Sequence, residues 1–318
     1  MTVVALAGGV GAARLLRGLV AVVPPADVTA VVNTGDDTEL HGLHISPDLD
    51  TVCYTLAGRN DEARGWGLRN ETWTAMEALE ELGGEAWFRL GDRDLATHLY
   101  RTQRLSEGAP LSTVTAELAE RMGVTVRVLP MTDEPVRTWL RLASDDREVP
   151  FQDYFVRLRH SVAVTAVRFD GADKAAPAPG VLEAIDAADV VIISPSNPVV
   201  SIGPILAMPA VTAALRRRRD QVVAVSPLVG GAALKGPADR LLVELGGEAS
   251  SAGVARRYAE VCGTLVIDDR DRADEESVAR LGMRCVVANT VMRGPDDAAA
   301  LAEVVLTAGR AGCSPTPS

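Results

Sequence analysis

Residues 2–19 read TVVALAGGVGAARLLRGL. The run from Thr2 to Ala7 is short and apolar, which favours a strand. The glycine turn 8–11 follows it, and leucines at helical spacing then indicate an amphipathic helix. A strand, a glycine turn and a helix in this order are typical of the start of a nucleotide-binding α/β fold. The glycines let a ligand approach the backbone, and the N-terminus of the helix favours anions.

The glycine turn matches the dinucleotide-binding fingerprint only in part. Counted from Gly9, the third glycine position of that fingerprint holds Arg14. A tight structural turn accounts for these glycines as well as a dinucleotide site does. The turn alone therefore leaves both interpretations open.

Apolar runs and helical patterns alternate along most of the chain. Strands are expected at Val28–Val32, 124–129, 162–169, Val190–Ile193, Val222–Val225, 264–267 and 284–288. Helices are expected at 47–56, 71–82, 111–122, 179–187, 237–245, 252–262, 274–281 and 296–308. This alternation predicts an α/β, Rossmann-like fold with a mostly parallel sheet covered by helices on both faces.

The middle of the chain departs from this alternation, because residues 136–159 have a β-like pattern. We predict a single domain over residues 1–318. Its α/β core occupies about 1–60 and 160–310, and a helical and β insertion occupies about 61–159.

Composition limits the possible functions. The chain has 32 basic and 43 acidic residues, a net charge of −11. This balance argues against binding to nucleic acid or to a membrane surface. No apolar run reaches the roughly 18 residues that span a bilayer. The cysteines show no C-x-x-C spacing, so we expect reduced thiols in a cytoplasmic protein rather than a zinc site. They are Cys53, Cys262, Cys285 and Cys313.

An acidic loop, residues 33–51, follows the expected strand Val28–Val32. It contains Asp36, Asp37, Asp48 and Asp50. In an open α/β sheet, ligands bind outside the carboxyl ends of the strands, where this loop should lie. Four aspartates on one loop repel each other unless a cation or donor groups lie among them. Mg²⁺ held by one or two carboxylates and by substrate phosphates would fit. A solvated acidic loop is the alternative.

A second polar segment reads WFRLGDRDLATH at residues 87–98. Its charged and hydrogen-bonding residues are Arg89, Asp92, Arg93, Asp94, Thr97 and His98. Such density directly after aromatic residues favours a functional segment. Alone, His98 would more often be an ordinary helix histidine.

Three strand-end loops, 8–11, 194–204 and 226–236, are rich in glycine, serine and asparagine. Their backbone N–H groups, hydroxyls and carboxamide suit a diphosphate or a purine edge. Two prolines fix the loop around Ser196 and Asn197, and a rigid connection with an Asx turn is the alternative.

Two further features have two interpretations each. The aromatic cluster of Phe151, Tyr154 and Phe155 is either a surface for a flat ring or a small hydrophobic core. Lys235 and Arg240 are placed where they could approach a phosphate. Taken with the acidic loop, these features suit group transfer from a nucleoside diphosphate ester, in which positioning and charge neutralisation dominate catalysis.

In order along the chain, these motifs resemble one family of transferases in coenzyme F420 biosynthesis. It is called 2-phospho-L-lactate transferase in archaea and phosphoenolpyruvate transferase in actinobacteria. The resemblance runs from about Val3 to Leu306. It rests on residues 8–11, 35–37, 46–51, 64–67, 90–98, 151–153, 194–204 and 226–230.

The resemblance implies a Mg²⁺-dependent enzyme, usually a homodimer. It would transfer a phosphoester unit from a guanosine-diphosphate-linked donor to the primary hydroxyl of the deazaflavin Fo and release GMP. Whether the unit is phosphoenolpyruvate, phospholactate or phosphoglycerate stays open. The insertion 61–159 would bind the deazaflavin.

Site residues carry over by motif. The catalytic candidates are Asp36, Asp37 and Asp50, and the metal candidates add Asp48. Contacts to Fo are expected from Asp50 and Arg89, together with Asp92, Arg93, Thr97 and His98. Contacts to the guanosine diphosphate are expected from Gly8, Gly9, Gly11, Ser194, Ser196, Asn197, Ser226 and Gly230.

Two rival functions belong to other classes. A non-catalytic regulator of the same fold would bind a nucleotide sugar. An NAD-dependent oxidoreductase would use the glycine turn with Asp36, which lies 25 positions after Gly11.

Overall fold

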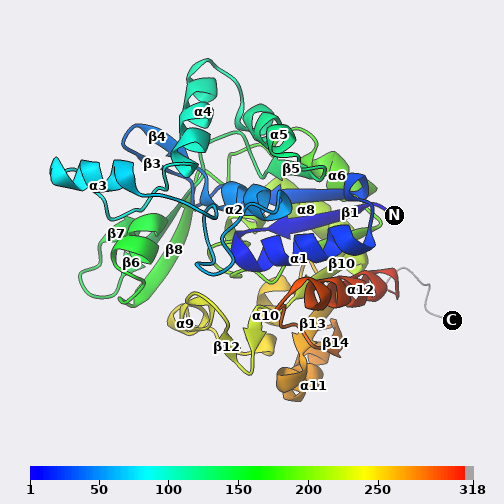
Figure 1. Ribbon diagram of the computed structural model, residues 1–318. Helices are drawn as coiled ribbons and strands as arrows, with labels where there is room; N and C mark the ends of the chain where they lie inside the picture. The colour runs from blue at the N-terminus through cyan, green and yellow to red at the C-terminus, as the bar shows by residue number, and fades with distance from the viewer. Residues whose placement is uncertain (312–318) are drawn as a thin grey trace.

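The computed structural model describes residues 1–311, built around a seven-stranded sheet (Figure 1). Every neighbouring pair of strands in this sheet is parallel. Its strands, in spatial order, are β14 (Arg284–Ala288), β13 (Thr264–Asp268), β10 (Val222–Val225), β9 (Val190–Ile193), β1 (Val3–Ala7), β2 (Val28–Val32) and β5 (Arg127–Pro130). The predicted α/β, Rossmann-like fold is confirmed.

Helices cover both faces of the sheet. Successive side chains of a strand point to opposite faces, and here the side chains on both faces are apolar and must be buried. Alternate residues of β1 accordingly belong to two different cores. One core is closed by α1 (Gly9–Val22), α2 (Pro47–Leu56), α5 (Leu111–Met122) and α12 (Pro295–Ala311). The other is closed by α6 (Val181–Ala187), α7 (Gly203–Leu206), α8 (Pro209–Arg217), α9 (Ala238–Glu244), α10 (Ser251–Tyr258) and α11 (Glu275–Arg280).

The order of the strands reverses beside β1. The next strand of the chain, β2, lies on one side of β1, whereas β9 lies on the other. The loops that leave the carboxyl ends of β1 and β9 therefore separate, and this is the position at which open α/β sheets bind ligands.

The segment between β2 and β9 also builds a second layer of structure, on the left of Figure 1. It contains α3 (Thr74–Glu81), α4 (Asp94–Ser106), the hairpin of β3 (Thr38–Leu40) and β4 (Leu43–Ile45), and an antiparallel sheet of β7 (Glu148–Pro150), β6 (Arg137–Leu142) and β8 (Val164–Asp170). Four strands depart from the predicted boundaries of 61–159. The strand β5, inside them, joins the core sheet. The strands β3, β4 and β8, outside them, belong to the second layer, where β8 pairs with β6.

Several local elements differ from expectation. The helix expected at 71–82 begins only at Thr74, where the Asp92 carboxylate caps its N-terminus. The β-like stretch 136–159 ends as a π-helix, Asp153–Arg157. Helix α4 was not predicted, because the face it buries carries Thr97, His98 and Arg101 instead of an apolar stripe.

A two-stranded hairpin, β11 (Leu228–Val229) and β12 (Ala232–Ala233), follows β10. Within residues 1–311, no helix is both long enough and apolar enough to cross a membrane. The described cysteines, Cys53, Cys262 and Cys285, are free thiols, and Cys313 lies outside the described residues.

Candidate active site

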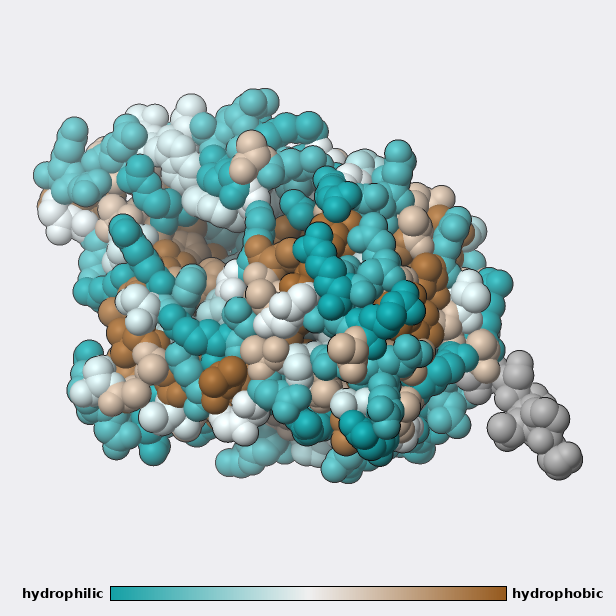
Figure 2. All heavy atoms as spheres, turned by 90° about the horizontal axis from the view of Figure 1, so that it is seen from below, coloured by the Kyte–Doolittle hydropathy of each residue, from teal (hydrophilic) through white to brown (hydrophobic). Residues whose placement is uncertain are grey.

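A cleft of about 880 Å³ lies at the carboxyl ends of the central strands. One wall belongs to the core and includes the glycine turn and residues 195–197, 200–201 and 290–293. The other wall belongs to the insertion and includes residues 64–67, 87–89, 151–152 and 155–156. Viewed from below, the surface is recessed toward the insertion, where brown hydrophobic residues lie among teal hydrophilic ones (Figure 2).

The structure brings eleven of the predicted site residues together in this cleft. They are Gly8, Gly9, Gly11, Asp36, Asp48, Asp50, Arg89, His98, Ser196, Asn197 and Ser226. Among the described residues, six predicted ones do not line it: Asp37, Asp92, Arg93, Thr97, Ser194 and Gly230.

Some of these six have local structural partners. The Asp37 carboxylate accepts a hydrogen bond from Ser46 Oγ at 2.7 Å, and its Oδ2 lies 3.0 Å from His44 Nε2. The Asp92 carboxylate caps α3. The backbone N–H of Gly230 donates to Asp271 Oδ2 at 2.9 Å.

The glycine turn packs tightly against its neighbours. A Cβ atom on Gly8 would lie 2.7 Å from Asp48 Oδ2, and one on Gly11 would lie 2.3 Å from the Pro195 carbonyl oxygen. Glycine is required at both positions because other groups approach the backbone so closely. The turn therefore joins α1, the Asp48 carboxylate and the loop after β9 into one wall, with the N-terminus of a 14-residue helix facing the cleft.

The loop after β9 contributes groups of two kinds. Asn197 Oδ1 accepts hydrogen bonds from the N–H groups of Val199 and Val200, so the Asx turn is present. Ser196 Oγ is buried and has no hydrogen-bond partner within residues 1–311. A buried hydroxyl without a partner is costly unless a ligand or water bonds to it, so Ser196 is available for a ligand.

Asp36 and Asp48 form an acidic pair held by amides. Asn33 Nδ2 donates to Asp36 Oδ1 at 3.2 Å and to Asp48 Oδ2 at 2.9 Å. From the insertion, Gln152 Nε2 donates to the Asp36 carbonyl oxygen at 3.1 Å and to its Oδ2 at 3.3 Å. These bonds fix both carboxylates at the edge of the cleft.

Burial makes this pair reluctant to ionise. It raises the pKa of Asp36 well above its usual value, and the charges of Asp48 and Asp37 raise it further. Burial also raises the pKa of Asp48 to about 6, against the hydrogen bond from Asn33. A cation between the two carboxylates would relieve both effects.

The donor set fits a hard divalent cation. Asp36 and Asp48 offer carboxylate oxygens, which Mg²⁺ prefers, and the cleft leaves room for substrate phosphates as further ligands. Asp37 does not line the cleft, and its buried Oδ1 has no hydrogen-bond partner in the described chain. Asp50 fits less well, because a guanidinium already neutralises it.

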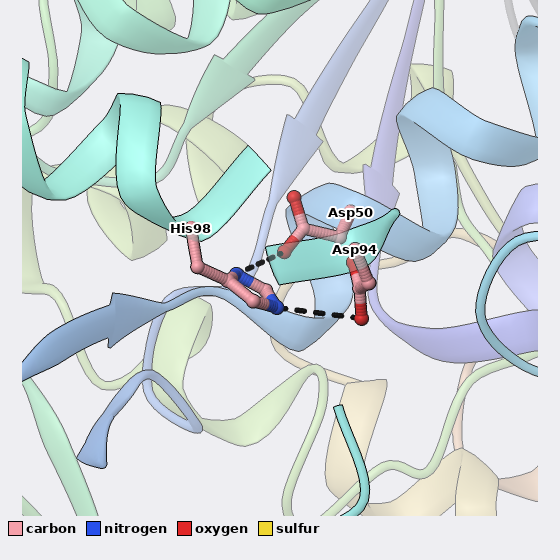
Figure 3. A group of neighbouring side chains, drawn as sticks. All are labelled: Asp50, Asp94 and His98. Carbon is pink, nitrogen blue, oxygen red and sulfur yellow. Dashed lines mark ion pairs between the residues drawn. The ribbon is translucent and has the colours of Figure 1, made fainter. Parts of the chain in front are cut away.

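Asp50 belongs to a buried network that joins α2 to α4. Arg101, only 2% exposed, donates to both carboxylate oxygens of Asp50, with Nη1 at 3.2 Å from Oδ2. The imidazole of His98 lies between two carboxylates, with Nδ1 at 3.7 Å from Asp50 Oδ2 and Nε2 at 3.3 Å from Asp94 Oδ2 (Figure 3). Tyr54 OH donates to Asp94 Oδ1 at 2.5 Å.

The spacing of Asp50, Asp94 and His98 alone would allow a metal ion, because one ligand atom from each lies within 4.8 Å of the others. Arg101 Nη1 lies 3.2 Å from both His98 Nδ1 and Asp50 Oδ2, so the positive charge is already supplied. We interpret this group as an ion-pair network rather than a metal centre.

The two carboxyl groups of the network have opposite pKa shifts. Burial raises the pKa of Asp50, although Arg101 and His98 oppose it. Burial also acts to raise the pKa of Asp94, but the hydrogen bond and charge of His98, the Tyr54 hydroxyl and Arg101 together lower it. Asp50 is therefore the cleft carboxylate of the two that more readily takes up a proton.

The aromatic cluster is in part a surface suited to a flat ring and in part hydrophobic core. Phe151 and Phe155 line the cleft as a stacked pair, with ring centroids 5.3 Å apart. Tyr154 is buried in the core, and its hydroxyl accepts a hydrogen bond from Arg240 at 2.6 Å. Of the two basic residues considered for phosphate, only Lys235 lines the cleft.

Sequence reasoning missed the groups that hold the aspartates: Asn33, Gln152 and Arg101. His98 and Arg101 are three residues apart, so they lie on one face of a helix. Had a helix been predicted at 94–106, this spacing would have indicated that the two side chains act together.

Three kinds of known protein resemble this chain. The family described as 2-phospho-L-lactate transferase CofD matches residues 3–301. A phosphoenolpyruvate transferase from Streptomyces griseus subsp. griseus is 47% identical over 310 residues, covering 96% of this chain and 98% of the relative. A second, from Kitasatospora aureofaciens, is 48% identical over 314 residues, covering 97% of each.

A 2-phospho-L-lactate transferase from Methanosarcina mazei is 40% identical over 301 residues, covering 95% of this chain and 98% of the relative. Among solved structures, a crystal structure of a UPF0052-family protein from Bacillus halodurans aligns with a TM-score of 0.62 and 18% identity. It covers 96% of this chain and 100% of its own, and supports the fold alone.

Proposed function

The chain belongs to the family of 2-phospho-L-lactate transferase CofD, and from this premise we propose its reaction. It transfers phosphoenolpyruvate from a guanosine-diphosphate-linked donor to the primary hydroxyl of the deazaflavin Fo. The products are dehydro-F420-0 and GMP, in coenzyme F420 biosynthesis. We choose phosphoenolpyruvate over 2-phospholactate because two relatives named for it are 47% and 48% identical, against 40% for the relative named for phospholactate.

The observation that carries the proposal is the division of the cleft. A glycine turn, a helix N-terminus and the free Ser196 hydroxyl form one wall, and such groups bind phosphate oxygens. The stacked rings of Phe151 and Phe155 belong to the other wall and suit a flat heterocycle. The acidic pair and Asp50 lie between the two walls, where a hydroxyl from one substrate would meet a phosphorus of the other.

Asp50 takes the proton of the acceptor hydroxyl in this mechanism. The hydroxyl oxygen bonds to the phosphorus that carries the enolpyruvyl group, and the bond from that phosphorus to the bridging oxygen breaks. The bridging oxygen leaves with GMP. Arg101 keeps the Asp50 carboxylate oriented, while burial keeps its pKa raised, which makes it a better base.

Asp36 and Asp48 are the residues that would hold Mg²⁺. The bound ion would supply charge neutralisation of the donor diphosphate. The backbone N–H groups of the glycine turn orient the same phosphates. The aromatic side chains of the insertion wall keep water, a competing acceptor, away from the reacting phosphorus.

One competition experiment tests the proposal. The purified protein is incubated with Fo, Mg²⁺ and equal amounts of the enolpyruvyl and lactyl diphosphoguanosine donors, and the products are identified by mass spectrometry. We expect dehydro-F420-0 to dominate, and Asp50→Asn to remove turnover while the protein stays folded. A dominant lactyl product would overturn the choice of donor, and full activity of Asp50→Asn would overturn its role.

The same preparation separates the rival functions. Protection from thermal unfolding by NAD, with none from GDP, would support the oxidoreductase. GDP or nucleotide-sugar binding without any product from Fo would support the non-catalytic regulator.

A further inference from the structure

Two arginines of the cleft contact the ring of Trp73. The guanidinium carbon of Arg64 is 5.1 Å from the Trp73 ring centroid, and that of Arg89 is 5.6 Å from it. Both distances are within the range of cation–π attraction. Arg64 and Arg89 line the cleft, whereas Trp73 is half-buried and outside the lining. One indole thus contacts two cationic side chains of the cleft, and Arg64 also lies over the ring of Trp66, at 4.8 Å from its centroid.

Two helix caps hold Trp73 in place. The Asp92 carboxylate accepts hydrogen bonds from the N–H groups of Thr74 at 3.1 Å and Ala75 at 3.0 Å, at the start of α3. In return, the Glu71 carboxylate accepts from the N–H groups of Arg93 and Asp94, both at 3.0 Å, at the start of α4. Each helix N-terminus is capped by a carboxylate from beside the other, which fixes the chain on both sides of the ring.

Gly91 completes this junction. A Cβ atom there would lie 2.2 Å from Glu71 Cδ, so only glycine lets the Glu71 carboxylate reach α4. Gly91 and Asp92 therefore shape the support of the cleft wall instead of lining the cleft themselves.

The two arginines differ in how fully their charges are satisfied. Arg64 donates to the carbonyl oxygens of Trp66 at 3.1 Å and Leu68 at 2.7 Å, and it lies 3.4 Å from an Asp61 carboxylate oxygen. In the described chain, the Arg89 guanidinium has no ion pair and no hydrogen bond, and Trp73 is its only aromatic contact. Its donors are therefore free for a ligand.

We propose that Trp73 is a positioning residue that presents Arg64 and Arg89 to oxygen atoms of the acceptor's ring system. This inference rests on the proposed function. Arg64 and Arg89 line the cleft together with the aromatic residues Trp66, Trp87 and Phe88 of the insertion. A guanidinium is planar and weakly hydrated, so it can lie along a flat heterocycle and donate to its carbonyl oxygens.

The test compares Trp73→Leu, which removes the aromatic face, with Trp73→Phe, which keeps one. The matched control is Trp139→Phe, since Trp139 also contacts an arginine, Arg168 at 5.9 Å, but lies outside the cleft lining. Acceptor Kd is measured by deazaflavin fluorescence. KM for each substrate and kcat are measured separately, and thermal unfolding monitors the fold.

We expect Trp73→Leu to raise acceptor Kd and KM about tenfold, the size expected for two weakened cation–π supports. Donor KM and kcat should change less than about twofold, because the substituted ring does not touch the reacting atoms. Trp73→Phe should retain most of the affinity, and Trp139→Phe should match the wild type.

Other outcomes overturn the proposal in distinct ways. A rise in donor KM alone would assign the arginine pair to the donor. Unchanged acceptor binding in both variants would leave Trp73 with a purely structural role. If Trp73→Leu unfolds, the test rests on Trp73→Phe. If that variant loses both acceptor affinity and thermal stability, the result counts against a positioning role for Trp73. Acceptor Kd is measurable without turnover, so failure of the proposed reaction would be recognised separately.

Discussion

Replacing Arg101 by leucine should leave Asp50 as a buried carboxylate without its partner. Both Asp50 oxygens bond to Arg101 in the structure, and both residues are buried. Removing one member of such a pair costs about 3–5 kcal/mol of stability, mostly from the stranded charge. We expect this loss in urea unfolding at pH 8.

The cost should depend on pH. Burial already holds the pKa of Asp50 above its ordinary value of 3.8, and loss of the opposing Arg101 charge raises it further. The folded variant then binds a proton that the unfolded chain releases. The contribution of this carboxyl to stability is therefore fully present below pH 3.8 and is lost as pH rises through the folded-state pKa. The destabilisation should therefore be smaller at pH 5 than at pH 8.

Two further variants make the reasoning refutable. Asp50→Asn on the Arg101→Leu background should restore much of the stability at pH 8, because the stranded charge is gone. Arg104→Leu is the matched control, since Arg104 lies on the same helix but pairs with Glu107 and Glu117 at the surface. An equal cost at pH 5 and pH 8, with no restoration by Asp50→Asn, would show that Arg101 acts through packing alone.

The remaining predictions concern the cleft and the thiols. Asp36→Asn should lower kcat by at least about 100-fold, yet leave stability at pH 8 equal or higher because a buried charge with a raised pKa is removed. Asp48→Asn should weaken Mg²⁺ binding in calorimetry, and in the wild type this binding should weaken below about pH 6, where protons compete for Asp48. Ser196→Ala should raise donor KM about 5–10-fold, as loss of one hydrogen bond of about 1–1.5 kcal/mol implies, without lowering the melting temperature. The thiols of Cys53 and Cys262 should react negligibly with a disulfide reagent at pH 8 in the folded protein, because burial raises the pKa of each to about 12.

The core sheet was predictable because parallel strands buried on both faces read as continuous apolar runs. Val28–Val32, Val190–Ile193 and Val222–Val225 were predicted with the bounds that the structure has. Helix α4 was not, because its buried face is polar: Arg101 and His98 are stabilised there by the partner Asp50, which no local pattern reveals.

Of the candidate site, only the residues close in sequence to a strand could be predicted. The glycine turn follows β1, and Asp36 and Asp37 follow β2 closely, so their place at the sheet edge could be inferred. Their partners come from far along the chain: Gln152 bonds to Asp36 across 116 positions, and Arg101 bonds to Asp50 across 51. Such pairings depend on the folded arrangement, which also decides that Asp92 supports the wall and does not line the cleft.

The position of β1 between β2 and β9 also has a consequence for biosynthesis. One edge of β1 can pair with β2 as soon as residue 32 has emerged, but the other edge pairs only with β9, which begins at Val190. At about 5–20 residues per second, a ribosome needs roughly 8–32 s to make the intervening chain. The nascent protein therefore carries an unpaired apolar strand edge for that interval, and an unpaired edge is a template for aggregation. Chaperones that bind extended apolar segments should therefore raise the yield of soluble protein when they act during synthesis.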